Sequence, residues 1–216
     1  MKRLKTFLLL LLVAFCPGWT SPAHVNLNAT DNNGVLLVYI GEMGAMGVDI
    51  AVEIDSTVGA RYDVVFQNGD NVLSHIAVFY KFSAPNQTIF YNYLSHQSVT
   101  HNCCESASSG SNVKAAGTGV IDNYSCTHVQ NVNNNERNAT DYWVSTQVPG
   151  YSLLLKILNS IGPGYQQLFV DGNIFQWGGL VRMTSTSHGR TVGSIDLTEA
   201  NPAMSFPAKD FDVPSN

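Results

Sequence analysis

The sequence predicts an all-β fold, a sandwich of antiparallel sheets, and three observations support this prediction. Short runs of β-branched and aromatic residues recur at spacings of about 8 to 12 residues, as in all-β sandwiches. Asp171-Gly172 lies between two apolar runs and is the strongest hairpin-turn signal in the chain. No segment combines a helical apolar period with capping residues at its ends.

The individual strands are expected where apolar residues run together or alternate with polar ones. Ile50, Val52 and Ile54 alternate with polar or small residues, so this strand should bury one face. Asn68-Gly69 predicts a hairpin turn. The expected strands are 35–40, 50–54, 62–67, 72–82, 88–94, 151–158, 165–170, 174–177 and 191–197.

One region breaks this pattern. Residues 95–140 are rich in Ser, Asn, Gly and Thr and show no apolar period, so they are expected to form a long loop inserted in a domain that spans residues 34–206. Residues 207–216 are expected to be a polar tail.

The amino terminus has the features of a secretory signal peptide. Basic residues up to Lys5 precede an apolar run of about eleven residues, and small residues follow at a suitable cleavage site. This run is too short to span a membrane, so residues 1–22 are expected to be removed and the product to be secreted. Four glycosylation sequons agree with export, at Asn28, Asn86, Asn123 and Asn138.

Composition and charge limit the partners. The chain has 216 residues, of which 44% are hydrophobic and 12% charged, so a soluble domain with one core is expected. Three of the 11 Lys and Arg residues lie in the leader, which leaves eight basic residues against 16 acidic ones. Such an acidic surface disfavours nucleic acid and anionic membranes. No second apolar stretch reaches membrane length.

The three cysteines after the leader are an odd number for an oxidising compartment. Neighbouring cysteines seldom bridge each other, so Cys126 is expected to pair with Cys103 or Cys104 and to close a loop of about 22 residues. The third cysteine either links two chains or remains a buried or capped thiol. His96, His101 and His128 lie nearby but lack zinc-site spacing, so no metal or other cofactor is expected.

The sequence favours binding over catalysis. It has no G-x-S-x-G motif. Ser185, Ser187 and His188 stand in a polar turn, and the sequence places no buried acidic residue near them that could complete a catalytic triad. Acidic residues on the early strands are expected on a solvated face, and their spacing does not mark an acid and base pair: Asp49, Glu53, Asp55 and Asp63. The protein is therefore expected not to be an enzyme.

Several segments resemble galectins in their order along the chain. Residues 62–75, followed by Thr88-Ile89-Phe90-Tyr91-Asn92, resemble the central galectin strands. Residues 148–158 are similar to the strand after the family's Phe-Pro-Phe-x-x-Gly turn, residues 165–173 to its F-x-V-x-V-N-G hairpin, and residues 192–198 to its closing I-x-G-D-I-x-L strand. This resemblance implies a jelly-roll sandwich of two antiparallel sheets that binds β-galactosides on its concave sheet.

The resemblance also implies candidate sugar-binding residues. The family pattern is H-x-N-P-R on one strand, N on the next, and then W-x-x-E-x-R. His75 and Asn92 match the histidine and the second asparagine, whereas Ala77 and Phe79 replace the first asparagine and the arginine. Trp143 is the nearest residue for stacking, and Glu136 and Arg137 are the nearest charges.

Structural roles for these side chains stand beside the ligand roles. His75 could bond a neighbour on the sheet, Asn92 could cap the local backbone, and Trp143 could pack in the core or at its rim. The resulting hypothesis is a secreted, non-catalytic, galectin-like lectin that binds glycans or glycoproteins, with a possible homodimer. The alternative is a galectin-fold protein that has lost sugar binding and now binds other proteins outside the cell.

Overall fold

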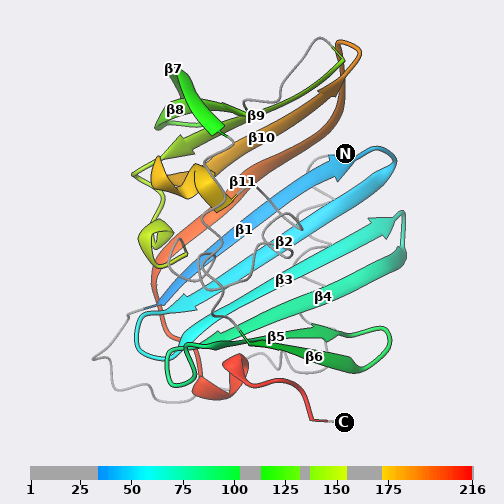
Figure 1. Cartoon of the computed structure of the whole chain (residues 1–216), viewed down its shortest axis with the longest axis vertical. Coiled ribbons are helices and arrows are strands. Elements are labelled where there is room, and N and C mark those ends of the chain that lie inside the picture. Colours follow the sequence, from blue (N-terminus) through cyan, green and yellow to red (C-terminus); the bar gives the residue numbers. More distant parts are fainter. Residues whose placement is uncertain (1–33, 103–112, 132–136, 155–171, 216) are drawn as a thin grey trace. The chain divides into compact units, whose positions relative to one another are not determined.

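In the computed structural model, the chain is an all-β protein whose strands form one antiparallel sheet (Figure 1). The structure describes residues 34–102, 113–131, 137–154 and 172–215. The strands are β1 (Gly34–Met43), β2 (Met46–Asp55), β3 (Gly59–Asn68), β4 (Asn71–Lys81), β5 (Gln87–Asn92), β6 (Gln97–Asn102), β7 (Val113–Ile121), β8 (Tyr124–Asn131), β9 (Asn138–Ser145), β10 (Gly179–Ser187) and β11 (Arg190–Met204). Two short 3-10 helices, η1 (Gly172–Gln176) and η2 (Ala208–Phe211), accompany them.

The strand order across the sheet is β6-β5-β4-β3-β2-β1-β11-β10-β9-β8-β7. Strands that are consecutive in the sequence are neighbours in the sheet, except β6 and β7, and the first strand, β1, pairs with the last, β11 (Figure 1). All eleven strands lie in one compact unit, Asn32–Val213. The all-β prediction is confirmed. The two-sheet jelly roll is not, because the described strands hydrogen-bond into a single sheet without crossovers.

The central hairpins form where alternation predicted them. The strands expected at 35–40, 50–54, 62–67, 72–82, 88–94 and 191–197 are confirmed with small shifts of boundary. The Asn68-Gly69 turn is also confirmed: Asn68 pairs with Asn71, and Gly69 has a φ of 60°, which glycine adopts without strain.

Strand β2 shows how this alternation makes two different faces. One side, here called the core face, carries apolar residues that are at most 5% exposed: Val48, Ile50, Val52 and Ile54. The opposite side, here called the strap face, carries Asp49, Ala51, Glu53 and Asp55. Cross-strand partners share a face, so the register extends both faces across the sheet.

The connection between β9 and β10 supplies further buried residues. Val148, Leu154, Ile174 and Phe175 are at most 3% exposed and belong to the same apolar cluster as the core-face residues. Residues 151–154 are helical, and η1 covers residues that were expected to be a strand. The strands predicted at 151–154 and 174–177 are therefore wrong. The rest of 151–158, the strand at 165–170 and Asp171 lie outside the described residues.

The long loop expected at 95–140 is also wrong, since β6, β7, β8 and the start of β9 lie within it. These strands are at or near the two edges of the sheet, and most residues of β6 and β7 are exposed. A strand that is exposed on both sides needs no apolar period, so this stretch of sequence carries no strand signal.

The link between β6 and β7 shows that the sheet is curved. These strands stand at opposite ends of the strand order, ten spacings apart, which would be about 48 Å in a flat sheet. The chain between Asn102 and Val113 can span at most about 40 Å. The sheet must therefore curl and bring its two edges closer together.

A segment after β11 crosses the strap face. This C-terminal strap, defined here as residues 208–213, contains η2 and contacts β3 and β4. Phe211 is fully buried, and Val213 packs against the apolar patch formed by Ala77, Phe79 and Tyr91. This part of the segment expected as a polar tail is thus anchored to the sheet by its apolar side chains.

Within the described ranges, the structure has no helix that is both long and apolar enough to cross a membrane.

Candidate functional site

The structure separates the two residues that best matched the galectin pattern. His75 lies opposite Val65 on the strap face, whereas Asn92 lies opposite Ile76 on the core face. Residues 75 and 76 are consecutive in β4, so their side chains point to opposite sides of the sheet. His75 and Asn92 therefore cannot contact one ligand in a shared groove.

Asn92 instead caps the backbone beyond the end of its strand. Its Oδ1 accepts hydrogen bonds from the backbone N–H groups of Leu94 and Ser95, at 2.9 and 3.1 Å. An asparagine at the end of a strand often satisfies the following turn in this way.

Trp143 shares the strap face with His75 but lies far from it. The register forms one cross-sheet row: His75, Val65, Asp49, Ile40, Asp196, Arg182, Trp143 and His128. Six strand spacings separate His75 from Trp143, about 29 Å along the sheet. Trp143 stacks on His128, whose Nε2 lies 3.0 Å from Asp141. Arg137 is exposed before β9, and Glu136 lies outside the described residues.

The expected galectin-type sugar site is therefore wrong. A concave sheet with histidine, asparagine and tryptophan converging on one saccharide requires neighbouring strands and a single face. The structure places His75 and Asn92 on opposite faces of two neighbouring strands, and Trp143 on a strand six spacings from that of His75.

A buried charged network surrounds His75. Arg61 donates to both carboxylate oxygens of Asp63, at 2.6 and 3.1 Å, and to the hydroxyl of Tyr93 at 3.0 Å. His75 Nε2 lies 3.1 Å from Asp63, and its ring stacks on Tyr93 at a centroid distance of 4.0 Å. The side chains of Arg61 and Asp63 are each 9% exposed, so each charge depends on the other for solvation.

Glu53 adds a second buried carboxyl group beside Arg61. It pairs across the strands with Arg61 and is 6% exposed, and its Oε2 has no hydrogen-bond partner within the described residues. Burial raises the pKa of Glu53 to about 7, against the lowering effect of Arg61, while Asp63 and the strap residue Asp210 raise it further. The solvated face expected for the acidic residues is thus wrong for Glu53, Asp55 and Asp63, which are 6 to 8% exposed.

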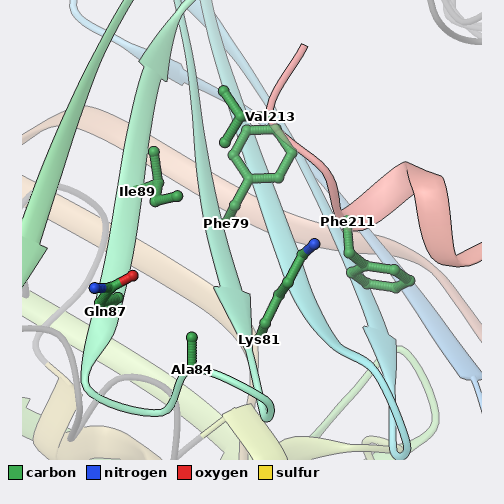
Figure 2. Close-up of a pocket in the computed structure, with 7 residues that line it drawn as sticks. All are labelled: Phe79, Lys81, Ala84, Gln87, Ile89, Phe211 and Val213. Carbon is green, nitrogen blue, oxygen red and sulfur yellow. The ribbon is translucent and has the colours of Figure 1, made fainter. Parts of the chain in front are cut away.

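Next to this network, the strap and the sheet form a pocket that is partly open to solvent (Figure 2). Its volume is about 160 Å³, and this cavity is here called the strap pocket. It is lined by Phe79 and Lys81 of β4, Ala84 of the following turn, Gln87 and Ile89 of β5, and Phe211 and Val213 of the strap. Arg61 lies over the ring of Phe79, 5.6 Å from its centroid, so the charged network supports one wall of the pocket.

Lys81 is the charged residue of this lining, and its ammonium group forms an ion pair with Asp212 of the strap. The Lys81 side chain is 37% exposed and that of Asp212 is 58% exposed, so the pair lies at the solvent side of the pocket. Figure 2 shows the end of the Lys81 side chain between Phe79 and Phe211. The site thus combines an apolar cavity with a cation at its edge.

The strap pocket was not predicted from the sequence. The sequence predicts no role for Lys81, and it shows Phe79 as the replacement for a sugar-binding arginine. Phe211 and Val213 fell in the expected polar tail, although they are two apolar residues separated by one polar residue. That short alternation was the available signal for a segment that packs on a surface.

The other predicted sites have these positions. Cys126 is a free, buried thiol in β8, and its expected partners Cys103 and Cys104 lie outside the described residues. Asn86, Asn123 and Asn138 are exposed, as glycosylation requires, and Asn28 lies outside the described residues. The described part of the chain contains no group of three or more His, Cys, Asp or Glu residues that could hold a metal ion.

Comparisons with known proteins bear on the fold alone. No protein-family model and no curated protein matches the sequence. An uncharacterized conserved protein from Thermus thermophilus is similar in structure, with a TM-score of 0.50 and 9% identity over 86% of this chain and 88% of that one.

Two further solved structures superpose more loosely. A putative outer membrane lipoprotein-sorting protein domain from Vibrio parahaemolyticus has a TM-score of 0.35 and 6% identity, over 85% of this chain and 91% of its own. LprF from Mycobacterium bovis has a TM-score of 0.32 and 12% identity, over 85% and 89%. The chain shares its fold with the Thermus protein. The expected galectin relationship is wrong, because the described strands form one sheet and not the two sheets of a galectin.

Proposed function

We propose that this protein is a non-catalytic binding protein that holds the apolar end of a small amphiphile in the strap pocket. The observation that carries this proposal is the cavity of about 160 Å³ between the sheet and the strap. An engineered apolar cavity of about 150 Å³ accommodates benzene, so the strap pocket matches roughly six carbon atoms.

The chemistry of the lining supports binding rather than catalysis. The seven side chains are Phe79, Lys81, Ala84, Gln87, Ile89, Phe211 and Val213. Apart from the amine of Lys81, which is ion-paired with Asp212, they include no acid, base or nucleophile of the kind that a hydrolytic site requires. Apolar walls with few polar groups are typical of sites that bind small molecules. The expected leader at residues 1–22 favours binding outside the cytoplasm.

Uncharged n-alcohols from butanol to octanol test the proposal on the intact protein. Each methylene that enters the pocket contributes about 0.8 kcal/mol, so the Kd should fall roughly fourfold per carbon until the cavity is full. Methyl NMR shifts of Ile89 and Val213 measure both the affinity and the place of binding.

Ala84→Leu is the pocket-filling variant for this test. Ala84 lies in the turn between β4 and β5, so a larger side chain should occupy the cavity without disturbing a strand. Ala115→Leu, on the exposed surface of β7, is the matched control. We expect Ala84→Leu to abolish the methyl shifts and Ala115→Leu to preserve them. A Kd that does not depend on chain length, or unchanged binding by Ala84→Leu, contradicts the proposal.

A further inference from the structure

Lys81 places a positive charge at the edge of the strap pocket. It is the charged residue among the seven that line the cavity, in a chain whose formal net charge is −5. The general field of such a protein repels anions, so any selection of an anion here must come from this local ammonium group.

The strap itself shows what this ammonium group accepts. Asp212 reaches Lys81 from 131 positions farther along the chain and presents a carboxylate to it. Val213, the next residue, packs into the apolar patch and lines the cavity. Together these two residues place a carboxylate on the cation and a short alkyl group in the pocket.

We propose that the strap pocket binds a monocarboxylate with an alkyl chain of about six carbons, whose carboxylate takes the place of Asp212 on Lys81. This inference rests on the proposed function and names its ligand class. The exchange is feasible because the Lys81–Asp212 pair is substantially exposed, and an exposed ion pair adds little to stability. The ligand replaces one carboxylate by another, so the lysine keeps a partner.

The test compares three probes with the same six-carbon alkyl chain on the intact protein: heptanoate, 1-hexanol and hexylamine. At low salt we expect heptanoate to bind about fivefold more tightly than 1-hexanol, and hexylamine to bind more weakly than either. Raising the salt concentration should reduce this preference, because the contact is open to solvent.

Two variants test which side chains cause the preference for a carboxylate. Asp212→Asn removes the competing carboxylate, so heptanoate should bind several-fold more tightly while the Kd of 1-hexanol stays the same. Lys81→Met keeps most of the apolar stem, so 1-hexanol should still bind while the preference for heptanoate disappears. Asp70→Asn in the β3–β4 turn and Lys114→Met on β7, both exposed, are the matched controls.

The outcomes separate this inference from the proposed function. Equal binding of heptanoate and 1-hexanol, with no effect of Asp212→Asn, overturns the head-group assignment and leaves the apolar pocket standing. Tighter binding of hexylamine overturns it as well, since Asp212 would then be the selecting group. If none of the three probes shifts the Ile89 and Val213 methyl signals, the proposed function fails together with this inference.

Discussion

Glu53 on β2 carries a carboxyl group that remains partly protonated near neutral pH. Burial raises its pKa to about 7, and the strap residue Asp210 contributes to the same shift. In an unfolded chain a glutamate titrates near pH 4.3. Between these two values the folded state binds a proton that the unfolded state has lost, so the stability of the protein depends on pH in this range.

We expect the free energy of unfolding to fall as the pH rises from about 4.5 to 7. The contribution of Glu53 is fully present below its unfolded pKa and is lost by the folded pKa, a change of roughly 3 kcal/mol. Glu53→Gln removes this titration, so the variant should be more stable than the parent above pH 7. Urea unfolding at pH 4 to 9 measures both profiles.

Glu42→Gln, which changes an exposed carboxyl group on the same face, is the control for this prediction and should keep the parent profile. Identical pH profiles of Glu53→Gln and the parent would contradict the role assigned to burial.

His75 and Asn92 illustrate what sequence patterns offer at the residue scale. Each has a structural role that the sequence already allowed: His75 contacts Asp63 and stacks on Tyr93, and Asn92 caps the backbone of Leu94 and Ser95. Because both residues match the galectin pattern, they were predicted to bind the same ligand. Only the register of β3, β4 and β5 shows that the two side chains point in opposite directions.

At the scale of elements, the C-terminal strap is a short segment held by a few side chains. Its η2 spans Ala208–Phe211, too short to be stable as an isolated helix, so packing must hold it on the sheet. Phe211 is fully buried and contributes the largest side chain among those below 2% exposure. The strap, and with it one wall of the pocket, therefore depends on this residue.

Phe211→Ala should destabilise the protein by about 3 to 5 kcal/mol, the usual cost of removing a buried phenyl ring. The loosening should be local: hydrogen exchange should accelerate in β3 and β4, which the strap contacts, more than in β8 and β9. Trp177→Ala is the control, because Trp177 is 36% exposed and lies outside the strap. Uniform acceleration over all strands would contradict a locally anchored strap.

Whether a strand was predicted correctly from the sequence depended on how deeply it is buried. Central strands such as β2 and β3 carry most of their apolar residues on one face, so period-two alternation predicted them. Strands β6 and β7 are exposed along most of their length, so their sequences show no alternation of apolar and polar residues. Residues 151–154 are mostly apolar but form a helical turn, in which the backbone N–H groups of Leu153 and Leu154 both donate to the carbonyl of Gly150.

At the scale of the whole molecule, the cysteines bear on how the two ends of the sheet are joined. Cys103 and Cys104 directly follow β6 at one end of the strand order, and Cys126 lies in β8, one strand from the other end. A disulfide between these positions would cross-link regions that are far apart in the strand order. In the structure Cys126 is a free thiol that is 3% exposed.

Peptide mapping under non-reducing conditions tests the predicted bridge. Protein secreted into an oxidising medium should yield a Cys126 peptide linked to the peptide that carries Cys103 and Cys104. Reduction should then lower the stability by roughly 3 kcal/mol, as expected for a loop of about 22 residues. Complete alkylation of Cys126 in unreduced, unfolded protein would contradict the bridge.

The sequence by itself determined the all-β class, the central hairpins with the Asn68-Gly69 turn, and the placing of Ile50, Val52 and Ile54 on one buried face. These features are local, since alternation and turn chemistry act over a few residues. Only the tertiary structure decided that the strands form a single sheet, that His75 and Asn92 face apart, and that Lys81 meets Phe211 and Val213 in one pocket. Those relations join residues more than a hundred positions apart or depend on strand register, and no local pattern in the chain encodes either.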